Sequence, residues 1–332
     1  MRSNGLFDLQ VNGYAGVDFN DTGLTPDALD HALHTMLLSG VTACLPTLIT
    51  ASEDVLAARF AALDRAVANG RLGPIMVPGY HLEGPFLNPT PGYAGCHNAA
   101  SMVMPDPALL ARLAGQLQRP ILLLTLAPER DGALSLIAGA RANGIVAAMG
   151  HTAANADEVT RAADAGLLLS THLGNALPQP QPKFVNPLMA QLAEDRLHAS
   201  FIADGIHIPP SALKVLLRAK GLARSILITD ATAAAAAPPG LYDFAGMKIE
   251  HAADGSVREP GSLVLAGSAL CLDRAVRNVV AWGLASPMEA IGMASATPTA
   301  LLDVGLPESW VEWDTALRPV KIFAGGVRIF RP

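Results

Sequence analysis

The sequence is poor in cysteine, in aromatic residues and in clustered positive charge. It has three cysteines among 332 residues, Cys44, Cys96 and Cys271, and none of them forms a CxxC pair. Three widely spaced cysteines argue against a disulfide framework and favour a reducing compartment. Lysine and arginine total 23 against 29 aspartate and glutamate residues, and no basic block occurs. Nucleic acid is therefore not an expected partner.

The sequence also lacks an uninterrupted apolar segment long enough to cross a membrane. Although 51% of the residues are hydrophobic, the long uncharged stretch 32–52 contains Gly40, Pro46 and several hydroxyl side chains. The first twenty residues carry charges at positions 2, 8 and 18 and have no apolar region typical of a signal peptide. We therefore expect a soluble, cytoplasmic globular protein that does not associate with a membrane.

Apolar runs typical of buried strands alternate with amphipathic helical segments along most of the chain. The predicted strands are 6–11, 42–48, 75–81, 121–126, 145–149, 167–172, 199–202 and 225–229. The clearest helices are 26–38, 52–68, 107–117, 157–165 and 210–219. Eight strand–helix units in sequence predict an α/β fold, a (β/α)8 TIM-like barrel, with catalysis at the C-terminal ends of the strands. The rival doubly wound sheet would need a glycine-rich turn after its first strand, which is not there.

The last hundred residues depart from this alternation. A hairpin is expected around Asp254-Gly255, followed by helices near 268–282 and 287–294. The tail 320–330 has two strand-like runs on either side of a glycine pair. We predict a metal-hydrolase barrel in residues 1–300 and a C-terminal appendage in residues 301–332, the remnant of a small β domain.

Four polar side chains follow predicted strands at the point where each strand ends. They are Glu83, His151, His172 and Asp230. Because the carboxyl ends of parallel strands meet at one mouth of a barrel, these side chains are expected to converge. A mononuclear metal hydrolase needs protein ligands of these types, an open position for water and a carboxylate that moves protons.

Eight short motifs in one order carry a family resemblance that runs from about residue 6 to about residue 300. The motifs are DLQVNG (8–13), LPT (45–47), HLEGPF (81–86), GHT (150–152), THLGNA (171–176), ADGIH (203–207), TDA (229–231) and GSAL (267–270). Together they resemble the N-acetylglucosamine-6-phosphate deacetylases of the amidohydrolase superfamily. The resemblance implies a barrel of the metal-dependent hydrolase type. The family's usual small β-sandwich is expected to be missing, or reduced to the C-terminal appendage, because the first barrel strand already begins at Leu6.

The resemblance implies that Glu83, His151 and His172 bind one divalent metal ion. Imidazole and carboxylate ligands suit Zn²⁺, with Fe²⁺ or Co²⁺ as alternatives. Many amidohydrolases carry a His-x-His pair at the end of the first strand and hold two metals. Here Gln10 and Asn12 stand at those positions, and amides are poor ligands for a transition metal. We therefore expect a mononuclear site.

Two further residues match catalytic positions of the family. Asp230 would accept a proton from the attacking water and pass it to the leaving amine. An N-terminal helix cap is the alternative role for this aspartate. His97 would contact the substrate and polarise the amide carbonyl, whereas the alternative is an ordinary surface-loop histidine. Cys96 is disfavoured as a nucleophile, because a neighbour in sequence is not a hydrogen-bonded base.

The resemblance also implies residues that hold the substrate. Asn175, Ala176 and His207 match positions that contact the sugar and its phosphate, and Gln10 is a further candidate contact. In the family an arginine supplied across a dimer interface binds the phosphate. Here the corresponding segment offers only Lys183, which lacks the bidentate fork of arginine. A homodimer is expected, and the phosphate specificity is open.

Three functions follow from these observations. The first is a metal-dependent amide hydrolase that removes the acetyl group from an N-acetylated amino sugar, with N-acetylglucosamine 6-phosphate as the best single substrate. The second is an amidohydrolase with the same metal chemistry that acts on another small amide, cyclic amide or imine without a phosphate. The third is a non-catalytic sugar-binding descendant, which would have no need for the proton-moving Asp230.

Overall fold

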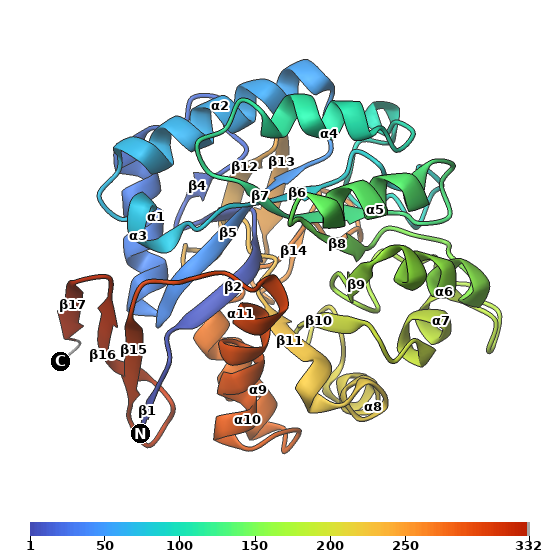
Figure 1. The fold of residues 1–332 in the computed structure, drawn as a ribbon. Helices are drawn as coiled ribbons and strands as arrows, with labels where there is room; N and C mark the ends of the chain where they lie inside the picture. Colours follow the sequence, from blue (N-terminus) through green and yellow to red (C-terminus); the bar gives the residue numbers. More distant parts are fainter. Residues whose placement is uncertain (331–332) are drawn as a thin grey trace.

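The computed structural model describes residues 1–330, in which eight parallel strands form a nearly closed barrel surrounded by helices (Figure 1). The strands adjoin in the order in which they occur in the sequence, and Val11 and Ala231 bridge the first strand to the residues after the last one. The (β/α)8 prediction is confirmed. The barrel strands are β2 (Leu6–Val11), β5 (Val41–Ile49), β6 (Tyr80–Glu83), β7 (Ile121–Leu126), β8 (Val146–Met149), β9 (Leu167–Ser170), β10 (His198–Ile202) and β11 (Ser225–Ile228).

Helices follow these strands and cover the outside of the barrel (Figure 1). Local sequence fixes several of their starts, as at α6, where Asn155 and Glu158 form a reciprocal capping box. No described helix is long and apolar enough to cross a membrane. The principal helices are α1 (Pro26–Leu38), α2 (Glu53–Asn69), α4 (Pro107–Ala114), α5 (Ala133–Ala142), α6 (Ala156–Ala165), α7 (Pro187–Ala193), α8 (Pro210–Lys220), α9 (Leu272–Ala281), α10 (Pro287–Met293) and α11 (Ala296–Leu302).

Each predicted strand region contains a barrel strand, but one boundary prediction is wrong. The predicted strand 75–81 begins within the short helix α3 (Gly73–Met76), and β6 starts only at Tyr80. Pro74 lies in the first turn of α3, where proline is pre-organised for a helix. Apolar side chains alone do not distinguish a buried helical turn from a buried strand.

Two small sheets lie outside the barrel. Strands β12 (Gly240–Phe244), β13 (Met247–His251) and β14 (Val257–Arg258) form one, which includes the hairpin expected near Asp254. The other joins β15 (Ser309–Trp313), β16 (Pro319–Ala324) and β17 (Val327–Phe330) to β1 (Arg2–Ser3), so the start of the chain also contributes to it. The boundary at residue 300 stays a prediction, and residues 331–332 of the predicted appendage lie outside the described residues.

A buried acid lies at the seam where the barrel closes. Asp8 of β2 is fully buried, and its carboxylate accepts hydrogen bonds from the Thr229 hydroxyl (2.5 Å) and the Thr229 backbone N–H (3.2 Å). Burial raises the pKa of Asp8 to about 7, although these hydrogen bonds act to lower it. Since Thr229 precedes Asp230, Asp8 links the first strand to the proposed catalytic residue through the backbone.

Replacing Asp8 by asparagine should change how stability depends on pH. The pKa of Asp8 is higher in the folded protein than in the unfolded chain, so the free energy of unfolding falls as pH rises from about 4 to about 7. An asparagine side chain cannot ionise, so Asp8→Asn should not show this fall. The free energy of unfolding of the variant minus that of wild type should therefore rise by about 2 to 4 kcal/mol across this window and level off above it. Urea unfolding of both proteins between pH 5 and 8 measures the difference. Parallel pH profiles would contradict the assignment.

Candidate metal and active site

A cavity of about 470 Å³ opens at the C-terminal ends of the barrel strands. Its lining comes from the segments that follow β6, β8, β9, β10 and β11, together with residues of β12 and of the segment after β14. Most of the predicted site residues line it: Glu83, His97, His151, His172, Asn175, Ala176, His207 and Asp230. The barrel thus brings together side chains that are up to 147 positions apart in the sequence.

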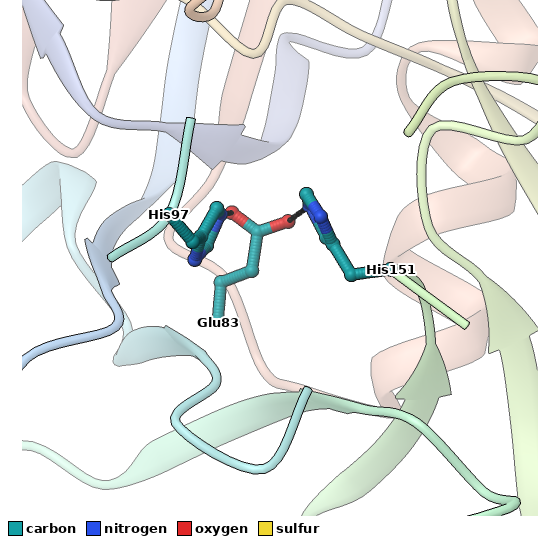
Figure 2. Close-up of side chains that lie close together, drawn as sticks. All are labelled: Glu83, His97 and His151. Atoms are coloured by element: carbon teal, nitrogen blue, oxygen red, sulfur yellow. Dashed lines mark ion pairs between the residues drawn. The ribbon is translucent and has the colours of Figure 1, made fainter. Parts of the chain in front are cut away.

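The Glu83 carboxylate lies at the centre of a cluster of imidazoles. His172 Nε2 and His151 Nε2 lie 3.0 and 3.4 Å from Glu83 Oε1. His97 Nε2 lies 3.6 Å from the other oxygen, Oε2. Figure 2 shows His97 and His151 on opposite sides of this carboxylate. All four side chains are buried.

The outward nitrogens of two of these imidazoles are held by protein groups. His151 Nδ1 lies 2.8 Å from the Tyr93 carbonyl oxygen, which can only accept a hydrogen bond. His97 Nδ1 lies 2.9 Å from the Thr50 hydroxyl, whose own hydrogen points to the Glu83 backbone carbonyl. In the singly protonated form of each ring, these partners assign the proton to Nδ1. The Nε2 lone pairs of both rings then face the Glu83 carboxylate.

Lone pairs that face a carboxylate fit a cation held between them. The ligand atoms of Glu83, His97 and His151 lie within 4.8 Å of one another, so this buried cluster could bind a metal ion. His172 contacts the same carboxylate, and its Nδ1 atom has no hydrogen-bond partner. A histidine with its other nitrogen bonded to a backbone carbonyl, as in His151, is typical of metal ligands in proteins.

Charge and burial act in opposite directions on the cluster. Burial alone would raise the pKa of Glu83, but the neighbouring imidazoles of His151, His172 and His97 hold it well below its usual range. Burial, together with repulsion from His151, lowers the pKa of His97 to about 4. These shifts favour an ionised Glu83 beside a neutral His97, whereas the charge of Glu83 raises the pKa of His172 against the effect of burial.

Asp230 lies two residues after the end of β11 in a left-handed backbone conformation, with φ +49°. Its Oδ1 atom accepts hydrogen bonds from Asn12 Nδ2 (2.7 Å) and Gln10 Nε2 (3.2 Å). Gln10 Nε2 also lies 3.1 Å from Glu83 Oε1, so one amide joins the two carboxylates. Burial and the negative charge of Glu83 raise the pKa of Asp230 to about 6. A carboxyl group with such a pKa can both accept and return a proton near neutral pH.

The predicted substrate residues divide into two groups. Asn175, Ala176 and His207 line the cavity, and His207 Nδ1 is hydrogen-bonded to Asp204 Oδ2 (2.6 Å). Gln10 lies behind the lining, between Glu83 and Asp230. Lys183 is exposed in the loop between β9 and α7 and is not part of the lining.

Sequence reasoning missed several residues that shape the site. One of them is Thr50, whose hydroxyl contacts His97 Nδ1. Its only sequence signal is its position shortly after a predicted strand. The cavity wall also includes Ile49, Phe244 and residues 263–265. No local pattern marks Phe244, because it reaches the cavity from a hairpin outside the barrel strands. Burial raises the pKa of the Cys96 thiol, consistent with the view that it is not a nucleophile.

We compared the chain with known protein families and with curated proteins. No model of a known protein family matches the chain. The chain is 34% identical over 297 residues to an N-acetylgalactosamine-6-phosphate deacetylase of Escherichia coli O157:H7, covering 90% of this chain and 77% of that protein. It is 31% identical over 285 residues to the N-acetylglucosamine-6-phosphate deacetylase of Bacillus subtilis, covering 83% and 68%.

Solved structures give the same result. The N-acetyl-D-glucosamine-6-phosphate deacetylase of Mycobacterium smegmatis superposes with a TM-score of 0.88 at 30% identity, covering 99% of this chain and 87% of that chain. An enamidase of the amidohydrolase superfamily, 14% identical with a TM-score of 0.56, shares the fold alone. The eight motifs, the barrel, the imidazole–carboxylate cluster and these relatives lead to one conclusion: the chain belongs to the N-acetylglucosamine-6-phosphate deacetylase family of the amidohydrolase superfamily.

Proposed function

We propose that this enzyme removes the acetyl group from an N-acetylated amino sugar phosphate, with N-acetylglucosamine 6-phosphate as the best single substrate. The observation that carries the proposal is the Gln10 amide, which contacts both Glu83 Oε1 and Asp230 Oδ1. It holds a proton-moving carboxylate beside a group suited to a metal ion. The names of the relatives, deacetylases of N-acetylglucosamine 6-phosphate and N-acetylgalactosamine 6-phosphate, support the substrate class.

One divalent metal ion, with Zn²⁺ as the first choice and Fe²⁺ or Co²⁺ as alternatives, would be held by Glu83, His151 and His172. The contacts of His151 and His172 with the same oxygen, Glu83 Oε1, support this set. The ligand atoms that lie within 4.8 Å of one another are those of Glu83, His97 and His151, so His97 is the competing ligand. A metal of this kind supplies Lewis acidity, which polarises the amide carbonyl and makes a water molecule more acidic. The amides of Gln10 and Asn12 are poor ligands for a second transition metal.

The reaction breaks the bond between the acyl carbon and the amide nitrogen. Oxygen from water joins the acyl carbon to give acetate, and the amine leaves with an added proton. Asp230 Oδ would accept the proton from water and return it to the leaving nitrogen. His97 would contact the substrate at the acyl carbonyl oxygen, where negative charge develops.

The sugar would be held by Asn175, Ala176 and His207, which line the cavity on the side of β9 and β10. We propose a homodimer, supported by the exposed Phe184 and Val185, with 78% and 81% of their surfaces accessible in the loop beside the cavity. We also propose a cytoplasmic location, because all three cysteines are free thiols.

Metal analysis of single variants tests the ligand assignment. The purified enzyme should contain one equivalent of divalent metal per chain. His172→Ala should lose most of this metal, because a ligand is deleted, whereas His97→Ala should retain it and lose turnover. Elemental analysis of both variants and the wild type measures the difference. Metal loss in His97→Ala with retention in His172→Ala would exchange the two roles, and two equivalents in the wild type would contradict the mononuclear site.

Asp230→Asn should keep the fold and the metal but lose most of its turnover. General acid–base catalysis contributes about 10² to 10⁴-fold, and here one carboxyl group serves both proton transfers. Steady-state kcat on N-acetylglucosamine 6-phosphate, measured with matched metal content, is the test. A variant that retains more than about a tenth of the wild-type kcat would show that another residue moves the protons.

The preference for a phosphorylated substrate should be moderate. Within the described residues, the cavity lining contains no lysine or arginine, which leaves His207 as the proposed phosphate contact. A charge-assisted hydrogen bond contributes roughly 1.5–3 kcal/mol. The ratio of kcat/KM for N-acetylglucosamine 6-phosphate to that for N-acetylglucosamine should therefore lie below about 10⁴, which corresponds to about 5.5 kcal/mol.

A larger ratio would contradict this expectation and indicate a cation donated by another subunit. Lys183→Gln then identifies the donor, because the exposed Lys183 does not line the cavity of its own chain. A sharp fall in the ratio in this variant would assign the phosphate contact to Lys183 of a neighbouring subunit.

A further inference from the structure

One wall of the cavity is apolar and is built where a hairpin outside the barrel meets a barrel strand. Phe244, at the end of β12, and Ile49, at the end of β5, both line the cavity. We call these two side chains the apolar wall. They belong to one buried cluster, formed by Ile49, Ala234, Phe244, Ile249, Val257 and Ala266. Ile49 pairs in register with Glu83 on the neighbouring strand, so the wall lies beside the candidate metal group.

Two charged side chains hold the turn that follows Phe244. The turn residues Ala245 and Gly246 are both left-handed, with φ +52° and +86°. The Ala245 backbone N–H donates to Asp18 Oδ2 (2.7 Å), and the Ala245 carbonyl accepts from Arg59 Nη2 (2.7 Å). Asp18 lies on β4 (Val17–Asp18) and Arg59 on α2, so both side chains come from outside the hairpin.

The Arg59 guanidinium also contacts the other half of the apolar wall. Its Nη1 atom donates to the backbone carbonyl of Ile49 (3.3 Å). One side chain, 6% exposed, therefore joins the end of β5 to the residue after Phe244. A planar guanidinium with several donors in a fixed geometry suits this bridge, and the negative charge of Asp18 offsets part of the cost of burying it.

The position of the wall indicates which end of the substrate it meets. β5 is second and β9 is sixth in the order of eight barrel strands, so they lie on opposite sides of the barrel. The proposed sugar contacts Asn175 and Ala176 follow β9. In an N-acyl amino sugar the acyl chain and the sugar ring extend from opposite ends of the amide. With the sugar on the side of β9, the acyl chain points toward β5 and the apolar wall.

We propose that Arg59 and Asp18 are positioning residues that fix the apolar wall at the acyl end of the pocket and so restrict the substrate to small N-acyl groups. The proposal rests on the proposed function, because it needs the sugar to lie on the side of β9. An apolar pocket discriminates against one extra methylene by about 10- to 200-fold when its walls do not yield. A wall held by charged hydrogen bonds through its backbone resists such displacement.

The test compares hydrolysis of N-acetylglucosamine 6-phosphate with that of its N-propionyl analogue. Wild type should prefer the acetyl substrate by at least about tenfold in kcat/KM. Arg59→Met, Asp18→Ala and Phe244→Ala should each lower this preference about fivefold or more, chiefly through KM for the propionyl substrate. Arg59→Lys, which keeps a charged hydrogen-bond donor at this position, should retain part of the acetyl preference. The matched control is Arg112→Met in α4, which removes an exposed ion pair with Glu53. Glu53 lies on α2, the helix that carries Arg59, and this variant should leave the acyl preference unchanged.

Amide hydrogen exchange separates the positioning role from a loss of fold. In Arg59→Met, exchange should accelerate in residues 240–251, while barrel peptides and metal content stay as in wild type. An unchanged acyl preference in this variant, with a loosened hairpin, would overturn the proposal. If Arg59→Met does not fold, an unchanged preference in Phe244→Ala overturns it equally. A wild type that releases acetate from neither sugar nor sugar phosphate would instead contradict the proposed function, and the acyl assignment with it.

Discussion

A carboxylate buried among imidazoles is the constraint on which this site depends. Glu83 is 2% exposed, and an unpaired charge at such depth would cost several kcal/mol. Its partners come from the loop after β6 and from the ends of β8 and β9. Those segments must converge for the charge to be satisfied. The register of the barrel strands therefore cannot shift by one residue without separating Glu83 from its imidazoles.

The same constraint explains where the backbone is strained. His151, His172 and Asp230, each within two residues of the end of a barrel strand, have φ of +51°, +32° and +49°. Residues other than glycine seldom adopt this region, and each such residue costs about 1–3 kcal/mol. The turn points each side chain back over the barrel mouth instead of along the strand. At Asp230 the strained conformation is held by neighbouring backbone, because its N–H donates to the Gln10 carbonyl and its own carbonyl accepts from Ser268.

Local pattern was sufficient for the barrel and for the residues at its strand ends. Alternating apolar runs and capped helices located all eight strands. Polar residues at the ends of buried strands, such as Glu83 and Asp230, can also be recognised in the sequence. The exception is α3, whose apolar residues carry no periodicity in four positions. The orientation of His97 could not be predicted, since it depends on the Thr50 hydroxyl 47 residues away. The roles of Phe244 and Arg59 could not be predicted for the same reason, because their contacts join the hairpin to the barrel.

The proposed chemistry and the proposed acyl selectivity therefore depend on different parts of this chain. The candidate metal ligands and the proposed proton-moving Asp230 lie at or just beyond the ends of β6, β8, β9 and β11, where the hydrogen-bonded barrel fixes their positions. The apolar wall is completed by β12, which pairs with β13 and contacts the barrel through Ile49. A change in the hairpin can alter the space beside Glu83 without moving any barrel strand. Conversely, Asp18 and Arg59 hydrogen-bond to backbone atoms of Ala245, and in our proposal these bonds, together with the buried apolar cluster, keep the wall in place.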